Sequence, residues 1–162
     1  MADLLVKLYT LPESGGLYSA LKEKGVEIKR AIGPEKIAVA GWVQANFSKA
    51  WASEAEVAFS QNPPGIFIAV KNGRMLGFAC YDSTARGFFG PIGVAEGERA
   101  GGLGKGLLLR TLEAMREAGY GYAIVGWAGP VDFFKKTVGA SVIEDSEPGV
   151  YKNMVRDQLS DD

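Results

Sequence analysis

Between an apolar run at 88–94 and a helical pattern from Leu103 to Ala118 lies the sequence Arg99-Ala100-Gly101-Gly102-Leu103-Gly104-Lys105-Gly106. A helix start is normally capped by Ser, Thr, Asp or Asn and favours acidic residues in its first turn. This start has glycines and two cations, Arg99 and Lys105, instead. Exposed amides, the positive end of a helix dipole and two cations together favour an anion from outside. A phosphate or a diphosphate is the natural candidate.

Two common phosphate-binding motifs do not fit this stretch. A P-loop requires Ser or Thr after its Gly-Lys pair, but Gly106 follows Gly104-Lys105, and its first glycine would fall on Arg99. The dinucleotide fingerprint G-x-G-x-x-G also fails, because its last glycine would fall on Leu107 or Leu109. The pattern that fits is Gln/Arg-x-x-Gly-x-Gly/Ala, present as Arg99-x-x-Gly102-x-Gly104.

This pattern resembles the pyrophosphate loop of the GNAT superfamily of acetyl-CoA-dependent acyltransferases. Its context agrees, with an apolar strand at 88–94 before it and the strand Tyr122–Trp127 after the helix. The resemblance extends from about Val26 to the end of the last predicted strand. It implies an N-acetyltransferase that moves an acetyl group from acetyl-CoA to a primary amine by direct attack on the thioester. An ordinary helix-entry loop is the alternative.

The composition sets limits on the class of protein. A chain of 162 residues with 47% hydrophobic residues suits one globular unit with a real core. A net charge of −1 argues against nucleic-acid or anionic-membrane partners. Histidine is absent and Cys80 is the single cysteine, so we expect no metal site and no internal disulfide. No signal peptide or membrane span is apparent, which predicts a cytoplasmic protein.

The order of elements predicts an α+β fold in which a mixed, mainly antiparallel sheet carries helices on both faces. Residues 1–25 are predicted to form an N-terminal strand-helix extension, with Ser14 as the helix cap, that covers a sheet edge or completes a homodimer. Residues 26–162 form the GNAT-like domain. Its predicted strands are 26–31, 66–70, 75–81, 88–94, 122–127, 140–143 and 150–155, and its predicted helices are 33–47, 48–59, 103–118 and 133–138.

The strand at 88–94 contains Gly90-Pro91-Ile92-Gly93, which predicts a bulge or a splayed edge because proline cannot donate to a central ladder. In GNAT enzymes the corresponding fourth core strand parts from its neighbour, and the pantetheine arm of the cofactor lies in the opening. The resemblance therefore implies that the main chain of Ile92 and Val94 holds this arm and that Phe134 packs on it. It assigns the diphosphate to Arg99, Ala100, Gly101, Gly102, Gly104 and Lys105. A bulge without a ligand is the alternative.

The catalytic residues depart from the family pattern. Many members have a Tyr in the last short helix to protonate the departing thiolate, and Phe134 stands there, which leaves Tyr151 as another source of a hydroxyl. Asp82 is the candidate base, with an ordinary turn aspartate or a chain of waters as alternatives. Trp51 and Trp127 are predicted to line the acceptor site. Cys80 has no histidine to activate it and is predicted to be a small buried apolar residue.

Two other functions remain open at this point. The missing tyrosine is compatible with a non-catalytic module that binds CoA as a sensor or mediates an interaction. A nucleotide-phosphate binder of another fold is the third possibility. The acceptor of the enzyme hypothesis is a primary amine of a small molecule or of a peptide, and the sequence does not identify it.

Overall fold

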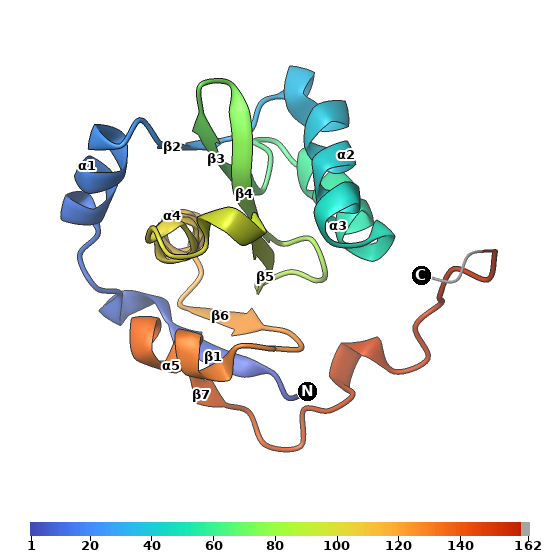
Figure 1. Ribbon diagram of the computed structural model, residues 1–162. Coiled ribbons are helices and arrows are strands. Elements are labelled where there is room, and N and C mark those ends of the chain that lie inside the picture. The colour runs from blue at the N-terminus through green and yellow to red at the C-terminus, as the bar shows by residue number, and fades with distance from the viewer. Residues whose placement is uncertain (160–162) are drawn as a thin grey trace.

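The computed structural model describes residues 1–159 and shows a seven-stranded mixed sheet with helices on both faces (Figure 1). The strand order is β2-β3-β4-β5-β6-β1-β7, and only β5 and β6 run parallel. The strands are β1 (Leu4–Lys7), β2 (Glu27–Arg30), β3 (Ile66–Lys71), β4 (Arg74–Tyr81), β5 (Phe88–Val94), β6 (Tyr122–Val125) and β7 (Ser141–Val142). The helices are α1 (Gly15–Glu23), α2 (Lys36–Asn46), α3 (Lys49–Phe59), α4 (Leu103–Glu117) and α5 (Val131–Val138). This architecture confirms the predicted α+β fold.

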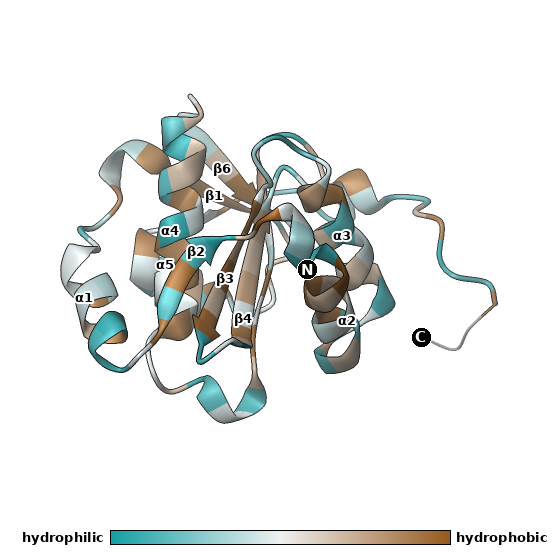
Figure 2. Cartoon of the chain, turned by 90° about the horizontal axis from the view of Figure 1, so that it is seen from above, coloured by the Kyte–Doolittle hydropathy of each residue, from teal (hydrophilic) through white to brown (hydrophobic). Residues whose placement is uncertain are grey.

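The two faces of the sheet bury separate hydrophobic clusters. Figure 2 shows the hydrophobic strands between α4 on one side and α2 and α3 on the other. Successive side chains of a strand point to opposite faces. On β4, Ala79 therefore joins the cluster beneath α4, whereas Phe78 and Cys80 join the cluster beneath α2 and α3. Cys80 is fully buried, as the sequence predicts for a small apolar residue.

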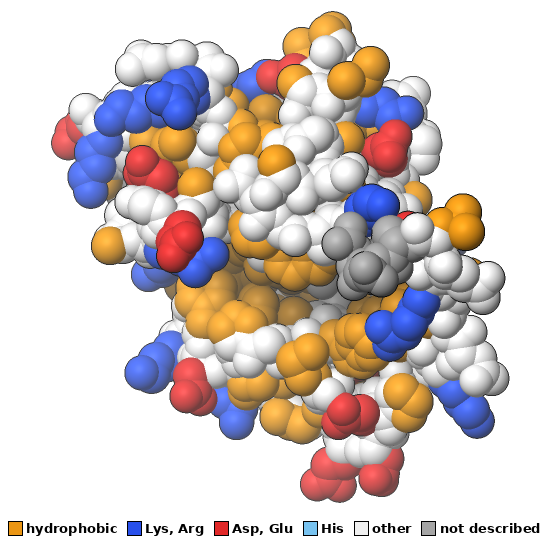
Figure 3. Space-filling model, turned by 45° about the vertical axis from the view of Figure 1, so that its right-hand side comes forward, with side chains coloured by type: hydrophobic (Ala, Val, Ile, Leu, Met, Phe, Trp, Pro, Cys, Tyr) orange, Lys and Arg blue, Asp and Glu red, His pale blue; other side chains and the backbone are white. Residues whose placement is uncertain are grey.

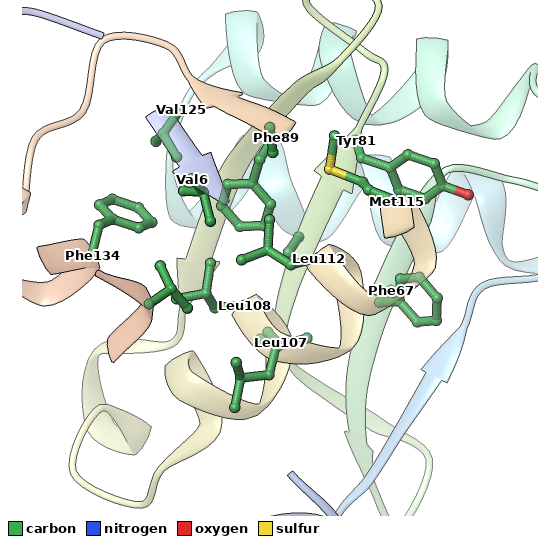
Figure 4. Close-up of a cluster of buried hydrophobic side chains, with 14 of the residues drawn as sticks. Val6, Phe67, Tyr81, Phe89, Leu107, Leu108, Leu112, Met115, Val125 and Phe134 are labelled. Atoms are coloured by element: carbon green, nitrogen blue, oxygen red, sulfur yellow. The ribbon is translucent and has the colours of Figure 1, made fainter. Parts of the chain in front are cut away.

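Helix α4 fills the larger cluster with Leu107, Leu108, Leu112 and Met115, which are fully buried (Figure 4). Gly106 lets this helix approach β2 closely, because a Cβ there would lie 2.5 Å from Ile28 Cδ1. Among the described residues, no helix is long and apolar enough to cross a membrane.

The N-terminal strand is part of the sheet itself. β1 lies between β6 and β7, with Leu4 opposite both Val125 and Val142. Leu4 and Val6 are fully buried, and this apolar face explains why the strand occupies an internal position. The expectation that residues 1–25 cover a sheet edge was wrong in this respect. The division of the chain at residue 25 and the homodimer stay predictions, and residues 160–162 of the second part lie outside the described residues.

Two local expectations are corrected. Ser14 precedes α1, but its hydroxyl donates to the Glu113 carboxylate at 2.9 and 3.0 Å rather than capping the helix. The predicted strand at 150–155 is absent from the described sheet, where the 3-10 helix η4 (Gly149–Tyr151) begins instead. Val150 and Val155 are 58% and 89% exposed, whereas the Tyr151 ring packs on Trp127, so the apolar side chains of this segment do not share one buried strand face.

Candidate active site

The glycine loop forms an uncapped helix start. After the 3-10 helix η3 (Glu96–Glu98), the chain reaches Gly102 at φ 81°, a left-handed conformation that favours glycine, and α4 begins at the next residue. No side chain caps this end. The backbone amides from Arg99 to Lys105 have no hydrogen-bond acceptor in residues 1–159. The first protein-bonded amide of the helix is that of Gly106, which donates to the Gly102 carbonyl at 3.0 Å.

Two cations flank these amides. Arg99 Nε donates to the Val94 carbonyl at 3.2 Å, which fixes the side chain against the end of β5. The Lys105 side chain is exposed. Neither residue forms an ion pair with any described carboxylate. The loop therefore combines unpaired donors, the positive end of the α4 dipole and two uncompensated positive charges, which is the arrangement that binds phosphate groups.

Strands β5 and β6 part beside this loop. Their parallel pairing covers only Phe88 with Ile124 and Phe89 with Val125. Between Ala79 and Tyr81 the register with β4 shifts, because Gly90 and Pro91 together face a single residue of β4. This bulge and the divergence that follows it confirm the predicted splay.

The free edge of β5 faces the opening. The Ala95 amide donates to the Leu76 carbonyl of β4 at 2.8 Å, and main-chain groups of successive residues in a strand alternate sides. The polar groups of Val94 and Ile92 consequently point away from β4 and toward the opening. The Val94 carbonyl accepts the hydrogen bond from Arg99 Nε. The Val94 amide and the amide and carbonyl of Ile92 have no strand partner on that side of the described sheet.

A cavity of about 230 Å³ lies where the two strands part. Its walls come from β5, from the segment that follows β6, from α3, from the turn between β4 and β5, and from η4. Figure 3 shows hydrophobic side chains gathered around a hollow on this face of the molecule. Four residues predicted from the sequence line the cavity: Trp51, Ile92, Trp127 and Phe134. The structure thus brings both predicted acceptor-side tryptophans beside the splay.

Phe134 lies mostly within the core. Only 2% of the residue is exposed, and its ring contacts the Phe89 ring edge-on with centroids 6.1 Å apart (Figure 4). Its remaining surface borders the cavity. Phe134 can therefore supply an apolar wall, but it has no hydroxyl with which to donate a proton.

Asp82, the predicted base, lies outside the cavity lining. One carboxylate oxygen accepts the Gly87 amide at 2.7 Å, and the other accepts the Tyr120 hydroxyl at 2.8 Å. The residue also has φ 57°, a conformation that Asp tolerates in turns. Both oxygens are engaged in holding the turn between β4 and β5, so the turn aspartate considered as the alternative matches the structure.

The carboxylate that does line the cavity is Glu54, on α3. It accepts a hydrogen bond from Thr84 Oγ1, while Ser83 Oγ donates to the Glu54 carbonyl at 2.7 Å. Burial raises the pKa of the Glu54 carboxyl, and the Thr84 hydrogen bond opposes that shift only in part. No motif marks Glu54 in the sequence, where it stands two positions before the exposed Glu56 on the same helix.

Tyr151 completes the opposite wall. Its ring stacks on Trp127 with centroids 4.2 Å apart, and its hydroxyl lies against Gly126, just after β6, since a Cβ at Gly126 would be 2.2 Å from Tyr151 Oη. Burial, followed by the charges of Glu54 and Asp3, raises the pKa of Tyr151 to about 12, so the phenol stays protonated at neutral pH.

Trp127 carries the one buried side-chain nitrogen or oxygen atom in residues 1–159 that has no hydrogen-bond partner, Nε1. Its backbone amide donates to Asp3 Oδ1 at 3.1 Å, which fixes the residue at the edge of the cavity. Buried polar groups are normally satisfied, so an unpaired indole N–H in a residue that lines the cavity is an exception in this structure.

Solved structures share this fold. A glucosamine N-acetyltransferase region of a fungal multi-domain GH3 β-N-acetylglucosaminidase has a TM-score of 0.72 and 16% identity, covering 88% of this chain and 19% of that one. A GCN5-related N-acetyltransferase from Sphaerobacter thermophilus has a TM-score of 0.66 and 16% identity, covering 88% of this chain and 48% of that one. This chain therefore spans half or less of the length of these two structures.

The sequence comparisons identify the family. No significant match is found among curated proteins. The sequence model described as the acetyltransferase (GNAT) family matches residues 36–139, which is more than half of the 162 residues and includes the splayed strands and the glycine loop. The splayed strands and the unpaired amides agree with this match. Because the model covers more than half of the sequence, the chain belongs to the GNAT family of acetyltransferases.

Proposed function

We propose that this protein is an N-acetyltransferase that uses acetyl-CoA and acetylates a primary amine. The observation that carries the proposal is the run of unpaired amides from Arg99 to Lys105, flanked by two unpaired cations at the mouth of the splay. A diphosphate supplies the missing acceptors and the missing negative charge. Family membership supports acyl transfer in general.

The remaining parts of the site suit the rest of the cofactor. The Ile92 groups and the Val94 amide can pair with the amide groups of a pantetheine arm as a neighbouring strand would. Phe134 offers this arm an apolar wall. An arm held in this way carries the acetyl thioester, the reactive group of the bound cofactor, into the cavity.

The cavity residues fit direct attack by an amine. The Tyr151 hydroxyl, held beside Gly126 and protonated at neutral pH, donates its proton to the departing thiolate. Tyr151 thereby serves as the proton donor, which Phe134 cannot do because it has no hydroxyl. Trp51 and Trp127 flank the acceptor. Because a structurally similar fungal region is described as a glucosamine N-acetyltransferase, glucosamine is the first acceptor to test.

A non-catalytic CoA sensor is the second candidate. The observation that favours it is Phe134, which stands where many family members have a tyrosine and which is almost completely buried. Turnover separates the two functions, because a sensor binds CoA but releases no thiol from acetyl-CoA in the presence of any amine.

The cofactor part of the proposal is tested with Gly104→Glu. Gly104 lies in the first turn of α4, and a Cβ there makes only ordinary contacts of 3.7 and 3.9 Å, whereas Gly102 at φ 81° would be strained by any side chain. The new carboxylate repels a diphosphate, so calorimetry should show CoA affinity reduced about tenfold or more. Gly41→Glu is the matched control, since Gly41 is an exposed glycine of α2 with open space around it.

The calorimetric result decides between clear outcomes. CoA binding by the wild type and the control, with weak binding by Gly104→Glu, supports the proposal. Equal CoA affinity of all three proteins, or no CoA binding by the wild type, contradicts it.

A further inference from the structure

The cavity that Trp51 and Trp127 line also holds the Glu54 carboxylate, which has no counter-ion in residues 1–159. Glu54 is the only Asp or Glu among the described residues that line the cavity, and no Lys or Arg lines it. The cavity does border Met1, whose ammonium is paired with the exposed Glu147. A partly buried carboxylate without a cation is an unfavourable arrangement that a bound cation relieves.

Glu54 is held in place rather than free to turn away. Thr84 Oγ1 donates to its carboxylate, and Ser83 Oγ donates to its carbonyl, so two residues of the β4–β5 turn fasten this part of α3. The titratable groups near it are the Tyr151 phenol and the buried Cys80 thiol, and the charge of Glu54 raises the pKa of both. Burial is the largest cause in each case, and both groups are neutral at physiological pH. Glu54 therefore forms no ion pair within the described residues, and a cationic ligand would supply the missing positive charge.

The other walls match the body of an organic amine. Trp51 and the stacked pair Trp127 and Tyr151 present aromatic rings to the cavity. Aromatic faces attract ammonium groups and stack on flat apolar or sugar rings. Trp127, which lines the cavity, also has a buried Nε1 without a hydrogen-bond partner in the described part of the chain, and such an unsatisfied donor is uncommon in a folded protein.

We propose that Glu54 binds the acceptor as its ammonium ion and takes the ammonium proton, and that the acceptors are amines with an uncharged body rather than amino acids. This proposal rests on the proposed function and names its substrate class. An amino-acid carboxylate would lie within the same cavity as Glu54, with no Lys or Arg to pair with it, and would be repelled.

The reaction balances with the groups at hand. The ammonium gives one proton to the Glu54 carboxylate, and the free nitrogen lone pair forms a C–N bond to the thioester carbonyl carbon. The C–S bond breaks, and the thiolate takes the proton of the Tyr151 hydroxyl. The second proton leaving the nitrogen restores that phenol, and Glu54 releases its own proton to solvent. The products are the N-substituted acetamide and CoA thiol.

The test compares the wild type with Glu54→Gln and with Glu56→Gln. Glu56 is the matched control, since it lies on the same helix and makes only a 3.9 Å exposed pair with Lys36. Thiol release is measured with two matched pairs of acceptors, which are 2-phenylethylamine with phenylalanine, and glucosamine with 2-amino-2-deoxyglucuronic acid, which keeps the sugar ring. CoA binding is measured in parallel by calorimetry on all three proteins.

In at least one pair, the member without a carboxylate should be acetylated, with a kcat/KM about tenfold or more above that of its carboxylated partner. Glu54→Gln should lower that kcat/KM by about 100-fold or more and remove the rise in rate on the acidic side of the pH profile, whereas Glu56→Gln should match the wild type. CoA affinity should be the same in all three proteins.

Three results would overturn the inference while CoA binding is intact. These are comparable turnover of an amine and its carboxylated partner, no turnover of any of the four compounds, or a Glu54→Gln protein that keeps its rate and pH profile. Failure of the wild type to bind CoA would instead refute the proposed function itself, so the two failures are distinguishable.

Discussion

The indole of Trp127 and the phenol of Tyr151 are stacked, with ring centroids 4.2 Å apart and planes inclined by 21°. This contact joins the segment after β6 to η4 and places a hydroxyl beside Gly126, where β5 and β6 part. A side chain far along the chain from the glycine loop thereby becomes part of the cavity. The cavity is therefore lined by the Tyr151 phenol as well as by Phe134.

Tyr151→Phe should keep the aromatic stack and remove only the hydroxyl. If the phenol protonates the thiolate, kcat should fall by about 100-fold or more while CoA affinity stays unchanged. Steady-state kinetics with acetyl-CoA and calorimetry with CoA measure the two quantities. Tyr9→Phe is the control, because Tyr9 is an exposed tyrosine outside the cavity lining. A Tyr151→Phe protein with unchanged kcat would exclude Tyr151 as the proton donor.

Gly126→Ala should displace the Tyr151 hydroxyl. The new Cβ would lie 2.2 Å from Tyr151 Oη and 3.0 Å from the Phe88 ring, so the free energy of unfolding should fall by about 1–3 kcal/mol. In a Tyr151→Phe background the closest atom is missing, and the loss should be smaller. Urea denaturation of the wild type, the two single variants and the double variant gives the coupling free energy between the two substitutions. Equal losses in both backgrounds would mean that the hydroxyl does not occupy this place.

Glu54 should make stability depend on pH. Because burial raises its pKa in the folded state, the folded protein binds the proton more tightly than the unfolded chain does. The resulting destabilisation is absent below the unfolded pKa and grows as the pH rises through the folded pKa. Glu54→Gln should therefore gain stability over the wild type at about pH 8 and not at about pH 4, as urea denaturation can measure. Glu56→Gln serves as the control, and a gain equal at both pH values would contradict this account.

Gly106→Ala tests the approach of α4 to β2. The new methyl group would lie 2.5 Å from Ile28 Cδ1 and 3.0 Å from Leu21 Cδ1, which are side-chain ends. Overpacking of this kind costs about 1–3 kcal/mol, and the better helix propensity of alanine offsets up to about 1 kcal/mol. We expect a net loss of stability that Ile28→Val restores in part, because valine lacks the Cδ1 atom. Thermal denaturation showing a more stable Gly106→Ala protein would contradict this packing.

The glycine loop, α4 and the splayed strand could be predicted because their signals are local. The loop is recognised from residues 99–106 alone, and the α4 pattern from the spacing of Leu108, Leu112 and Met115. The bulge at Gly90-Pro91 is expected because proline cannot donate to the ladder and glycine weakens a strand. Each of these features needs only a short window of sequence.

Other parts of the cavity could not be predicted because they depend on tertiary contacts. Glu54 lies two positions from the exposed Glu56 on the same helix, and only the tertiary contacts of the two side chains distinguish them. Asp82 lies close along the chain to the splayed strand, but its carboxylate accepts hydrogen bonds from the Gly87 amide and the Tyr120 hydroxyl in the turn. β1 pairs with β6 and β7, which lie more than a hundred positions away, and no local pattern records such a pairing.

The central claim is that the unpaired amides of the glycine loop hold the diphosphate of CoA, and amide chemical shifts test it most directly. Titration of the isotope-labelled protein with CoA should move the amide signals of Gly101, Gly102 and Gly104, whereas pantetheine, which lacks the diphosphate, should leave them in place. Signals of these three glycines that stay unmoved at saturating CoA, or that pantetheine moves equally, would contradict the account.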